Sequence, residues 1–420
     1  MTEEKKPRVP LYAAILGAMI LGLVVGPYLG PLNPVLGEVG RIIIMLIKGV
    51  ATPLLFLSIV NAIITTEVQG RGALRMVGFA LVNVTIAIAI GLTLSNVLEP
   101  GKTLVLTGYE GGDTSAYAGK KVDFLKTLVS YVPSNFVTPF SENIVISVIL
   151  IALALGFALR RVRAEQIAEG STAYLAIENA ITTMLGITHV VLRWVILLIP
   201  FAVFAVAAKT VGQHGYEPLR GLAAYVGVGL LGLALHIVIT YQAWLVFYVR
   251  MPLRRFWSHA REPLVVGVGT NSSLATLPVT LRALDRLGVS RSASTLGACV
   301  GTNLNNDGIV LYEGMAVLFV AQAMGIDLTF SQQLLAAVTC IVAAMGVAGV
   351  PEAGFISLAL VLGTLGLPIE ILPLLLSVDW VVARARSIIN VCSDMLLSIL
   401  VDRSGGADLT GRSSPAASDS

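Results

Sequence analysis

The sequence predicts an all-α, polytopic membrane protein, and three observations support that fold class. Of its 420 residues, 56% are hydrophobic and only 13% are charged, and its mean hydropathy of +0.85 lies outside the range of soluble globular proteins. Apolar runs of about 20 residues, the length of helix that crosses a bilayer core, recur along the chain. In the second half these runs are interrupted by Gly, Pro, Ser, Thr and Asn.

Six apolar runs in the first 250 residues are long enough to cross a membrane. They occupy residues 10–27, 38–66, 74–98, 143–161, 177–208 and 221–249. Basic loops at 71–75, 160–163 and 250–261 alternate with poorly basic loops, so the positive-inside rule predicts that they lie in the cytoplasm with the N-terminus. The start, MTEEKKPRVP, lacks a small-residue cleavage site, which predicts that the first helix is retained.

Three polar interruptions divide the later apolar runs, at 267–280, 301–308 and 346–354. Non-helical backbone at membrane depth is tolerated only where it is buried in protein or lines a watery cavity. Paired broken segments are typical of the midplane binding site of a transporter. The outer two interruptions predict re-entrant hairpins over 255–290 and 331–368, each followed by a helix that carries polar residues.

The last of these helices contains the stretch DWVVARARSIINVCSD at 379–394. At about 100° per residue, one face gathers its polar side chains and places Ala383 among them, while Arg384 points elsewhere. That face holds Asp379, Arg386, Ser387, Asn390 and Asp394. Ionisable side chains inside a membrane helix usually face a cavity, and an arginine fork can bind a carboxylate bidentately. Two readings of Arg386 stay open, a substrate ligand or one half of an internal ion pair with Asp379.

Several other classes of protein are disfavoured by the composition. The formal net charge of +3 is not gathered in a basic patch, so no nucleic-acid partner is expected. The three cysteines, Cys299, Cys340 and Cys392, have no CxxC spacing, and the four histidines are scattered without a metal-binding pattern. No nucleophile elbow or HExxH motif is present, so an enzyme is not expected.

Together the motifs resemble the dicarboxylate/amino acid:cation symporter family, the glutamate-transporter-type carriers. The resemblance rests on the hairpin tip at 272–278, on the NNDG break at 305–308, on the GVPEAG tip at 349–354 and on the polar helix at 379–394. It implies eight transmembrane helices, two re-entrant hairpins, inverted repeats, a homotrimer in the plasma membrane and an elevator-like movement. In a prokaryote that membrane is the inner membrane.

The resemblance also implies a division into a scaffold and a mobile transport domain. The scaffold would comprise residues 1–70 and 124–215, and the transport domain residues 71–100 and 216–402. Residues 101–123 would form an extracellular loop and residues 403–420 a disordered cytoplasmic tail.

Carried over residue by residue, the family pattern implies two groups of ligands. The substrate would be bound by Ser272, Ser273, Val350, Pro351, Gly354, Ala383, Arg386, Ser387 and Asn390. Coupled Na⁺ would be bound by Gly301, Asn305, Asp307, Asn390 and Asp394. No other cofactor is implied.

The main departure from the family pattern is Ala383, because amino-acid carriers place there the aspartate that binds the substrate ammonium. A buried ammonium would lack its partner. This predicts a substrate with two carboxylates and no amino group, such as malate, succinate or fumarate. The alternatives are an acidic amino acid symporter, in which Asp379 or Asp394 replaces the lost partner, and an uncoupled anion channel.

A second departure concerns the ions. The family's usual Met between Asn and Asp is here Asn306. Positions that usually offer Thr, Ser or another hydroxyl group are here Ala344, Val347, Ala80, Asn83 and Val84. Fewer coupled sodium ions, or protons in place of some, are therefore open alternatives. Glu313 is interpreted as a proton carrier or as the partner of a neighbouring arginine, and Glu352 as a solvated residue of the hairpin tip.

Overall fold

The structure, a computed structural model, describes residues 11–65, 71–104, 129, 131–142, 144–216, 218–345 and 353–406. Every regular element within these residues is helical, which agrees with the predicted fold class. Val350, Pro351 and Glu352 lie outside the described residues, as do most of the predicted extracellular loop and the tail beyond residue 406.

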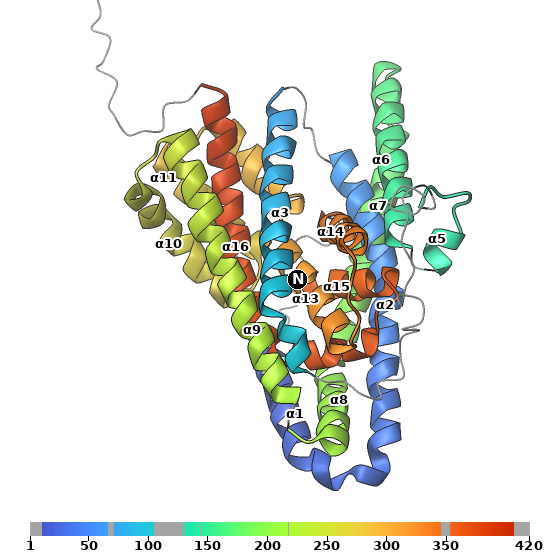
Figure 1. The fold of residues 1–420 in the computed structure, drawn as a ribbon. Coiled ribbons are helices and arrows are strands. Elements are labelled where there is room, and N and C mark those ends of the chain that lie inside the picture. Colours follow the sequence, from blue (N-terminus) through green and yellow to red (C-terminus); the bar gives the residue numbers. More distant parts are fainter. Residues whose placement is uncertain are drawn as a thin grey trace, which may run out of the picture.

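Except for α3, which packs on helices of the second half, the helices of the first half form one packed group, drawn at the lower and right-hand side of Figure 1. They are α1 (Leu11–Val25), α2 (Asn33–Thr65), α3 (Arg71–Leu98), α5 (Thr138–Ser141), α6 (Val145–Ala168), α7 (Tyr174–Ile196) and α8 (Ile199–His214). Helix α2 packs against α6, α7 and α8, and α1 packs against α8.

The apolar run at 177–208 differs from the expected continuous helix. It is divided between α7 and α8, with Leu197 and Leu198 in a turn between them. Pro200 stands in the first turn of α8. Proline has no N–H for the carbonyl four residues earlier, so the helix is interrupted where that hydrogen bond is missing.

The second half contains the broken helices. Its elements are α9 (Pro218–Leu235), α10 (Leu253–Thr270), α11 (Ser273–Leu287), α12 (Arg291–Ser294), α13 (Asp307–Ala323), α14 (Phe330–Met345), α15 (Ala353–Thr364) and α16 (Leu372–Ser404). Among the residues that the structure describes, three π-helical turns interrupt the α-helical geometry, at His236–Tyr241, Trp244–Val249 and Thr295–Val300.

Four stretches of the described residues are long and apolar enough to cross a membrane. These are Val35–Asn61, Leu74–Leu98, Tyr174–Gln213 and Arg220–Val249. Large apolar side chains on several helices are exposed, for example Met184 of α7 and Phe247 beyond α9. Exposed apolar side chains of this kind are favourable in contact with lipid and unfavourable in contact with water.

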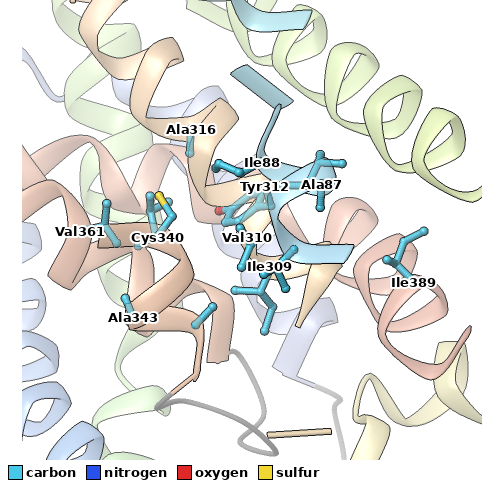
Figure 2. Close-up of a cluster of buried hydrophobic side chains, with 14 of the residues drawn as sticks. Ala87, Ile88, Ile309, Val310, Tyr312, Ala316, Cys340, Ala343, Val361 and Ile389 are labelled. Atoms are coloured by element: carbon cyan, nitrogen blue, oxygen red, sulfur yellow. The ribbon is translucent and has the colours of Figure 1, made fainter. Parts of the chain in front are cut away.

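Helices α13 and α16 lie at the centre of the fold. Every residue of α13 except Gln322 is buried, and the helix packs against α3, α9, α14, α15 and α16. Figure 2 shows Val310 and Tyr312 of α13 beside Ile88 of α3, with Cys340 of α14 and Val361 of α15 nearby. Because apolar side chains enclose these two helices, the polar residues that they carry are held away from lipid.

The predicted interruptions coincide with breaks between helices. Helix α10 ends at Thr270, and Asn271 takes the left-handed conformation, with φ 50° and ψ 37°. Ser272 then caps α11, because its side chain accepts a hydrogen bond from the N–H of Ala275. Helices α10 and α11 pack against each other as a hairpin. The second interruption is the short turn Gly301–Asn303 before α13, and most of the third lies outside the described residues.

Candidate functional site

The polar face predicted for α16 is buried in the centre of the molecule. The exposed fractions are 1% for Asp379, 3% for Ala383, 4% for Arg386, 7% for Ser387, 8% for Asn390 and 3% for Asp394. Burial of two aspartates and an arginine is unfavourable unless each finds partners. The partners therefore define what each group can do.

Arg386 is paired within its own helix. Its Nη1 and Nη2 each donate to one carboxylate oxygen of Asp379, both over 2.8 Å. The ring of Tyr312 in α13 lies below the guanidinium, 3.9 Å from Cζ to the ring centroid. The internal ion pair considered from the sequence is therefore present, and both oxygens of Asp379 are used. A guanidinium carries five N–H donors, so this pairing leaves three for a ligand.

Gly354, at the start of α15, lies directly against the same guanidinium. A Cβ added there would lie 3.1 Å from Arg386 Cζ and 3.3 Å from each Nη atom. The start of the second hairpin arm and Arg386 are thus brought together. Val350 and Pro351, the other predicted ligands of this hairpin, lie outside the described residues.

The first hairpin tip contacts α16 at Ser387, the residue that follows Arg386. Ser387 Oγ donates to Asn271 Oδ1 over 2.8 Å, and Ser273 Oγ lies 3.3 Å from Thr302 Oγ1. The Ser272 hydroxyl serves as the helix cap over 3.2 Å. The tip is therefore joined to α16 and to the turn before α13, although Ser272 already has a structural role.

Asn390 holds the beginning of α13. Its Oδ1 accepts a hydrogen bond from the N–H of Gly308 over 3.1 Å. A Cβ at Gly308 would lie 2.9 Å from the carbonyl oxygen of Arg386. The glycine of the NNDG break therefore permits the close approach of α13 to α16, which places the Arg386 end and the cation residues in one region.

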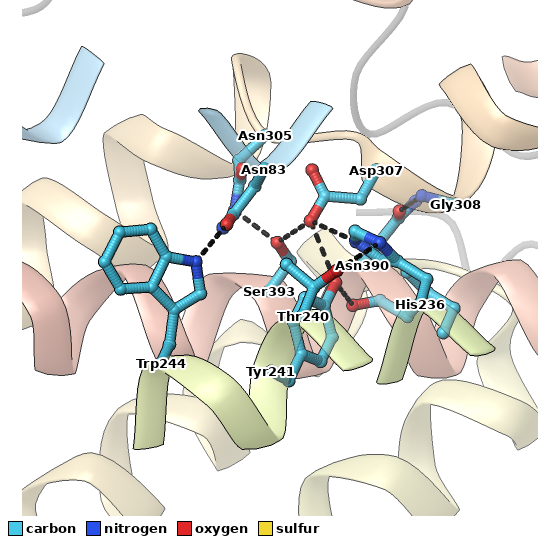
Figure 3. A network of polar contacts seen from close by, with 11 residues as sticks. Asn83, His236, Thr240, Tyr241, Trp244, Asn305, Asp307, Gly308, Asn390 and Ser393 are labelled. Atoms are coloured by element: carbon cyan, nitrogen blue, oxygen red, sulfur yellow. Dashed lines mark hydrogen bonds and ion pairs between the residues drawn. The ribbon is translucent and has the colours of Figure 1, made fainter. Parts of the chain in front are cut away.

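Two buried carboxylates, those of Asp394 in α16 and Asp307 at the start of α13, each have one oxygen without a partner among the described residues. Asp394 Oδ2 accepts from Thr302 Oγ1 over 2.9 Å, whereas Oδ1 is buried and unpaired. Asp307 Oδ2 accepts from Ser393 Oγ over 2.6 Å, whereas its Oδ1 is likewise buried and unpaired. Asn305 Oδ1 has the same status, and its Nδ2 donates to Ser393 Oγ (Figure 3).

These unpaired oxygens are of the chemical kind that a small hard cation binds. Three buried acceptors from Asn305, Asp307 and Asp394 lack hydrogen-bond donors within the described part of the chain, and unsatisfied buried acceptors are costly unless something compensates them. Carboxylate and carbonyl oxygens at helix breaks are the ligands that transporters use for Na⁺. Gly301 is less available, because its carbonyl accepts from the N–H groups of Leu304 and Asn305, both over 2.8 Å.

Sequence reasoning missed a histidine and a tyrosine that lie after α9. His236 and Tyr241 both reach the Asp307 carboxylate, with His236 Nε2 at 3.2 Å and Tyr241 Oη at 2.9 Å from Oδ2. The scattered spacing of the histidines gave no reason to select His236. The signal that could have found it is the one applied to Arg386, an ionisable side chain inside an apolar membrane-spanning segment.

Glu313 and Asn83 have partners that the sequence did not predict. Glu313 is fully buried and accepts a hydrogen bond from Ser357 of α15; no ion pair with an arginine is described for it. Asn83 of α3 accepts from Trp244 Nε1 over 2.8 Å. This candidate ion position on the third helix is therefore engaged by a side chain of the chain itself.

The fold and the site define a class of protein: a helical membrane transporter, in which broken helices converge on buried charges at the centre. The chain belongs to the sodium:dicarboxylate symporter family, whose sequence model matches residues 11–404. This confirms the resemblance seen in the motifs.

Curated relatives from bacteria support the same assignment. The chain is 30% identical to a C4-dicarboxylate transport protein of Burkholderia multivorans, over 95% of this chain and 93% of the relative. It is also 30% identical to C4-dicarboxylate transport protein 2 of Bradyrhizobium diazoefficiens, over 95% and 89%, and to the C4-dicarboxylate transport protein of Burkholderia lata, over 95% and 93%.

Proposed function

We propose that the protein is a secondary active symporter that carries C4-dicarboxylates such as malate, succinate or fumarate together with Na⁺. The observation that carries this proposal is the buried guanidinium of Arg386 beside the start of α15, with Ala383 one turn before it in place of an acid. The names of the bacterial relatives and of the family agree with a dicarboxylate substrate.

In this proposal Arg386 binds one substrate carboxylate through N–H donors that Asp379 leaves unused. Ser387, Asn390 and the backbone of the two hairpin tips, including Ser272, Ser273, Val350, Pro351 and Gly354, bind the rest of the anion. Na⁺ is held by oxygens of Asn305, Asp307, Asn390 and Asp394, and the Gly301 carbonyl joins them only by giving up a hydrogen bond that it accepts from Leu304 or Asn305. The cation compensates the buried carboxylates, which is why transport of the anion would depend on it.

An acidic amino acid substrate is the main alternative, and it needs an acid to bind the ammonium. Asp379 is a poor candidate because both of its oxygens already accept from Arg386. Asp394 keeps a free oxygen, but that oxygen belongs to the proposed cation site. The available partners therefore favour a substrate without an amino group.

The mechanical part of the proposal rests on the family resemblance. We propose a homotrimer in the bacterial inner membrane with both termini in the cytoplasm. In each protomer the transport domain, residues 71–100 and 216–402, would move against the scaffold, residues 1–70 and 124–215. Protons in place of some Na⁺, with Glu313 as the carrier, remain an alternative form of the coupling.

Uptake into proteoliposomes tests the proposal. Labelled succinate should accumulate when an inward Na⁺ gradient is imposed, unlabelled malate and fumarate should compete, and aspartate should compete weakly. A pH gradient imposed without Na⁺ separates proton coupling from sodium coupling. Strong aspartate uptake that succinate does not inhibit would refute the substrate, and an ohmic anion current without accumulation would indicate a channel.

The position of Ala383 provides a matched test of specificity. Ala383→Asp places a carboxylate one helical turn from Arg386, in a site that is 3% exposed. We expect succinate affinity to fall by about tenfold, because the introduced carboxylate and a carboxylate of succinate are brought together in a desolvated site. Aspartate uptake should rise. Ala383→Asn, which has nearly the same size without the charge, is the control. Equal losses in the two variants would contradict the electrostatic explanation.

A further inference from the structure

The Asp307 carboxylate is held asymmetrically by the protein. Its Oδ2 accepts from Ser393 Oγ over 2.6 Å and from Tyr241 Oη over 2.9 Å, and His236 Nε2 lies 3.2 Å away (Figure 3). All four side chains have exposed fractions of 0%. The other oxygen, Oδ1, has no partner within the described residues. One oxygen is therefore saturated and the other is available.

Thr240 orients the imidazole of His236 for this contact. The Thr240 hydroxyl lies 3.1 Å from His236 Nδ1. A carboxylate oxygen can only accept, so Nε2 carries the hydrogen that is donated to Asp307, and the Thr240 hydroxyl is the hydrogen-bond partner of Nδ1. A ring nitrogen fixed by one partner determines what the other nitrogen can do, as it does for histidines near metal ions.

The local helix geometry explains how two residues of one segment reach the same oxygen. In an α-helix, positions five apart point in directions about 140° apart. His236–Tyr241 is instead a π-helical turn, in which hydrogen bonds join residues five apart, so the first and last side chains return to nearly the same face. Such turns occur frequently at functional sites. The π turn therefore brings His236 and Tyr241 together on Asp307.

The same cluster includes a second available oxygen. Ser393, which donates to Asp307, accepts from Nδ2 of Asn305, whose Oδ1 is buried and unpaired in the described structure. Ser393 thereby fixes the amide of Asn305 and the carboxylate of Asp307 relative to each other. Their two unpaired oxygens are hard acceptors of the kind that binds an alkali cation.

We propose that His236 and Tyr241 are positioning residues of the deep cation site formed by Asp307 and Asn305, an inference that rests on the proposed Na⁺ coupling. They hold Asp307 Oδ2, so that Oδ1 remains directed to the cation. Neither residue is bonded to Arg386, which pairs with Asp379. Weakening this hold should therefore reduce cation affinity and leave dicarboxylate recognition unchanged.

Equilibrium Na⁺ binding by the purified full-length protein, without substrate, tests this inference. The unfolding temperature is followed as NaCl replaces choline chloride at constant ionic strength, since a cation that binds the folded state raises it. Tyr241→Phe removes one hydroxyl and keeps the ring. We expect its Na⁺ affinity to fall by about tenfold, the size of effect seen when residues that orient a metal ligand are changed. Asp307→Asn identifies the part of the titration that belongs to this site.

Tyr248→Phe is the matched control, because Tyr248 stands in the next π turn with a 39% exposed side chain that packs on Phe79 and Trp244. It should titrate like the wild type. Thr240→Val, which leaves His236 in place but removes its orienting hydroxyl, should weaken Na⁺ binding in the same direction as Tyr241→Phe.

The affinity for succinate at saturating Na⁺, measured in the same samples, separates positioning from general loosening. It should change by less than about twofold in Tyr241→Phe. An unchanged Na⁺ titration in Tyr241→Phe, beside a weakened one in Asp307→Asn, overturns the inference, and so does an equal loss of Na⁺ and succinate affinity. If the wild type shows neither Na⁺ binding nor Na⁺-driven uptake, the proposed function itself fails.

Discussion

The two ends of the polar face of α16 differ in how completely the protein satisfies their charges. At one end Arg386 and Asp379 form a bidentate pair with Tyr312 beneath the guanidinium. At the other end Asp394 keeps one buried carboxylate oxygen without a donor, as does Asp307 of the neighbouring α13, among the residues that the structure describes. The charge of the arginine is compensated internally, and those of the two carboxylates are not.

The difference in charge compensation indicates which kind of ligand each end of this face binds. Removing one partner of a buried ion pair costs about 3–5 kcal/mol, so Arg386 and Asp379 each depend on the other, and Arg386 can bind an anion only through its remaining donors. A buried carboxylate with an unused oxygen is already unfavourable, and a cation relieves that cost. The charge of Arg386 at the anion site is therefore compensated within the chain. The carboxylates of the cation sites depend on a bound ion for compensation.

The largest expected effect comes from removing the Arg386 side chain. Arg386→Ala should reduce succinate uptake by about 100-fold or more, and should lower the free energy of unfolding by about 3–5 kcal/mol because Asp379 is left buried and unpaired. Uptake into proteoliposomes and thermal unfolding measure the two effects. Arg384→Ala is the control, since the Arg384 guanidinium lies over Trp380, 5.7 Å from the ring centroid, and donates to the Trp380 carbonyl oxygen over 2.7 Å.

A double variant separates the role of Arg386 as a ligand from its role as an ion-pair partner. Asp379→Ala combined with Arg386→Ala removes both charges, so stability should return toward the wild type while uptake stays absent. Recovery of uptake together with stability would show that Arg386 acts only as a structural partner.

A smaller effect, on Na⁺ affinity, is expected from a change at the Asp394 end of α16. Asp394→Asn removes the negative charge and should weaken Na⁺ binding by about tenfold, because cation affinity follows the charge of the ligands. In Na⁺-free solution the same variant should be more stable than the wild type, since an uncompensated buried charge is gone. Unfolding temperatures at low and high Na⁺ measure both effects.

The matched control for this variant is Asp402→Asn, in the same helix. Both Asp402 oxygens accept hydrogen bonds from Ser290, over 2.5 and 3.3 Å, so this substitution should lower stability at every Na⁺ concentration. If Asp394→Asn behaved in the same way, the contrast between the two ends of α16 would not hold.

The smallest effect is expected from Gly354→Ala. The added Cβ would lie 3.1 Å from Arg386 Cζ, so the guanidinium must shift by a few tenths of an ångström. Overpacking of this kind costs about 1 kcal/mol, which corresponds to about a fivefold higher KM for succinate. Competition assays at saturating Na⁺ measure it. Gly363→Ala, near the other end of α15, provides the comparison, and a loss of Na⁺ affinity in place of succinate affinity would contradict the assignment.

Much of the fold and part of the site could be predicted from the sequence. Periodicity places Arg386, Asn390 and Asp394 on one face of a helix, because residues three, four, seven and eight apart share a side. The hairpin break at Asn271 and Ser272 follows from residues that favour the left-handed conformation and helix capping. The division of the run at 177–208 was missed, although Pro200 carried the signal.

The sequence by itself determined what kinds of charge the membrane interior must hold, because composition, helical period and helix breaks act locally along the chain. Only the tertiary structure decided how those charges are satisfied. Asp307 meets His236 across 71 residues of sequence, and a π turn that no local pattern predicts adds Tyr241 to the same oxygen. Hydrogen-bond partners depend on which helices pack together, and that packing is set by the whole apolar core rather than by any one segment.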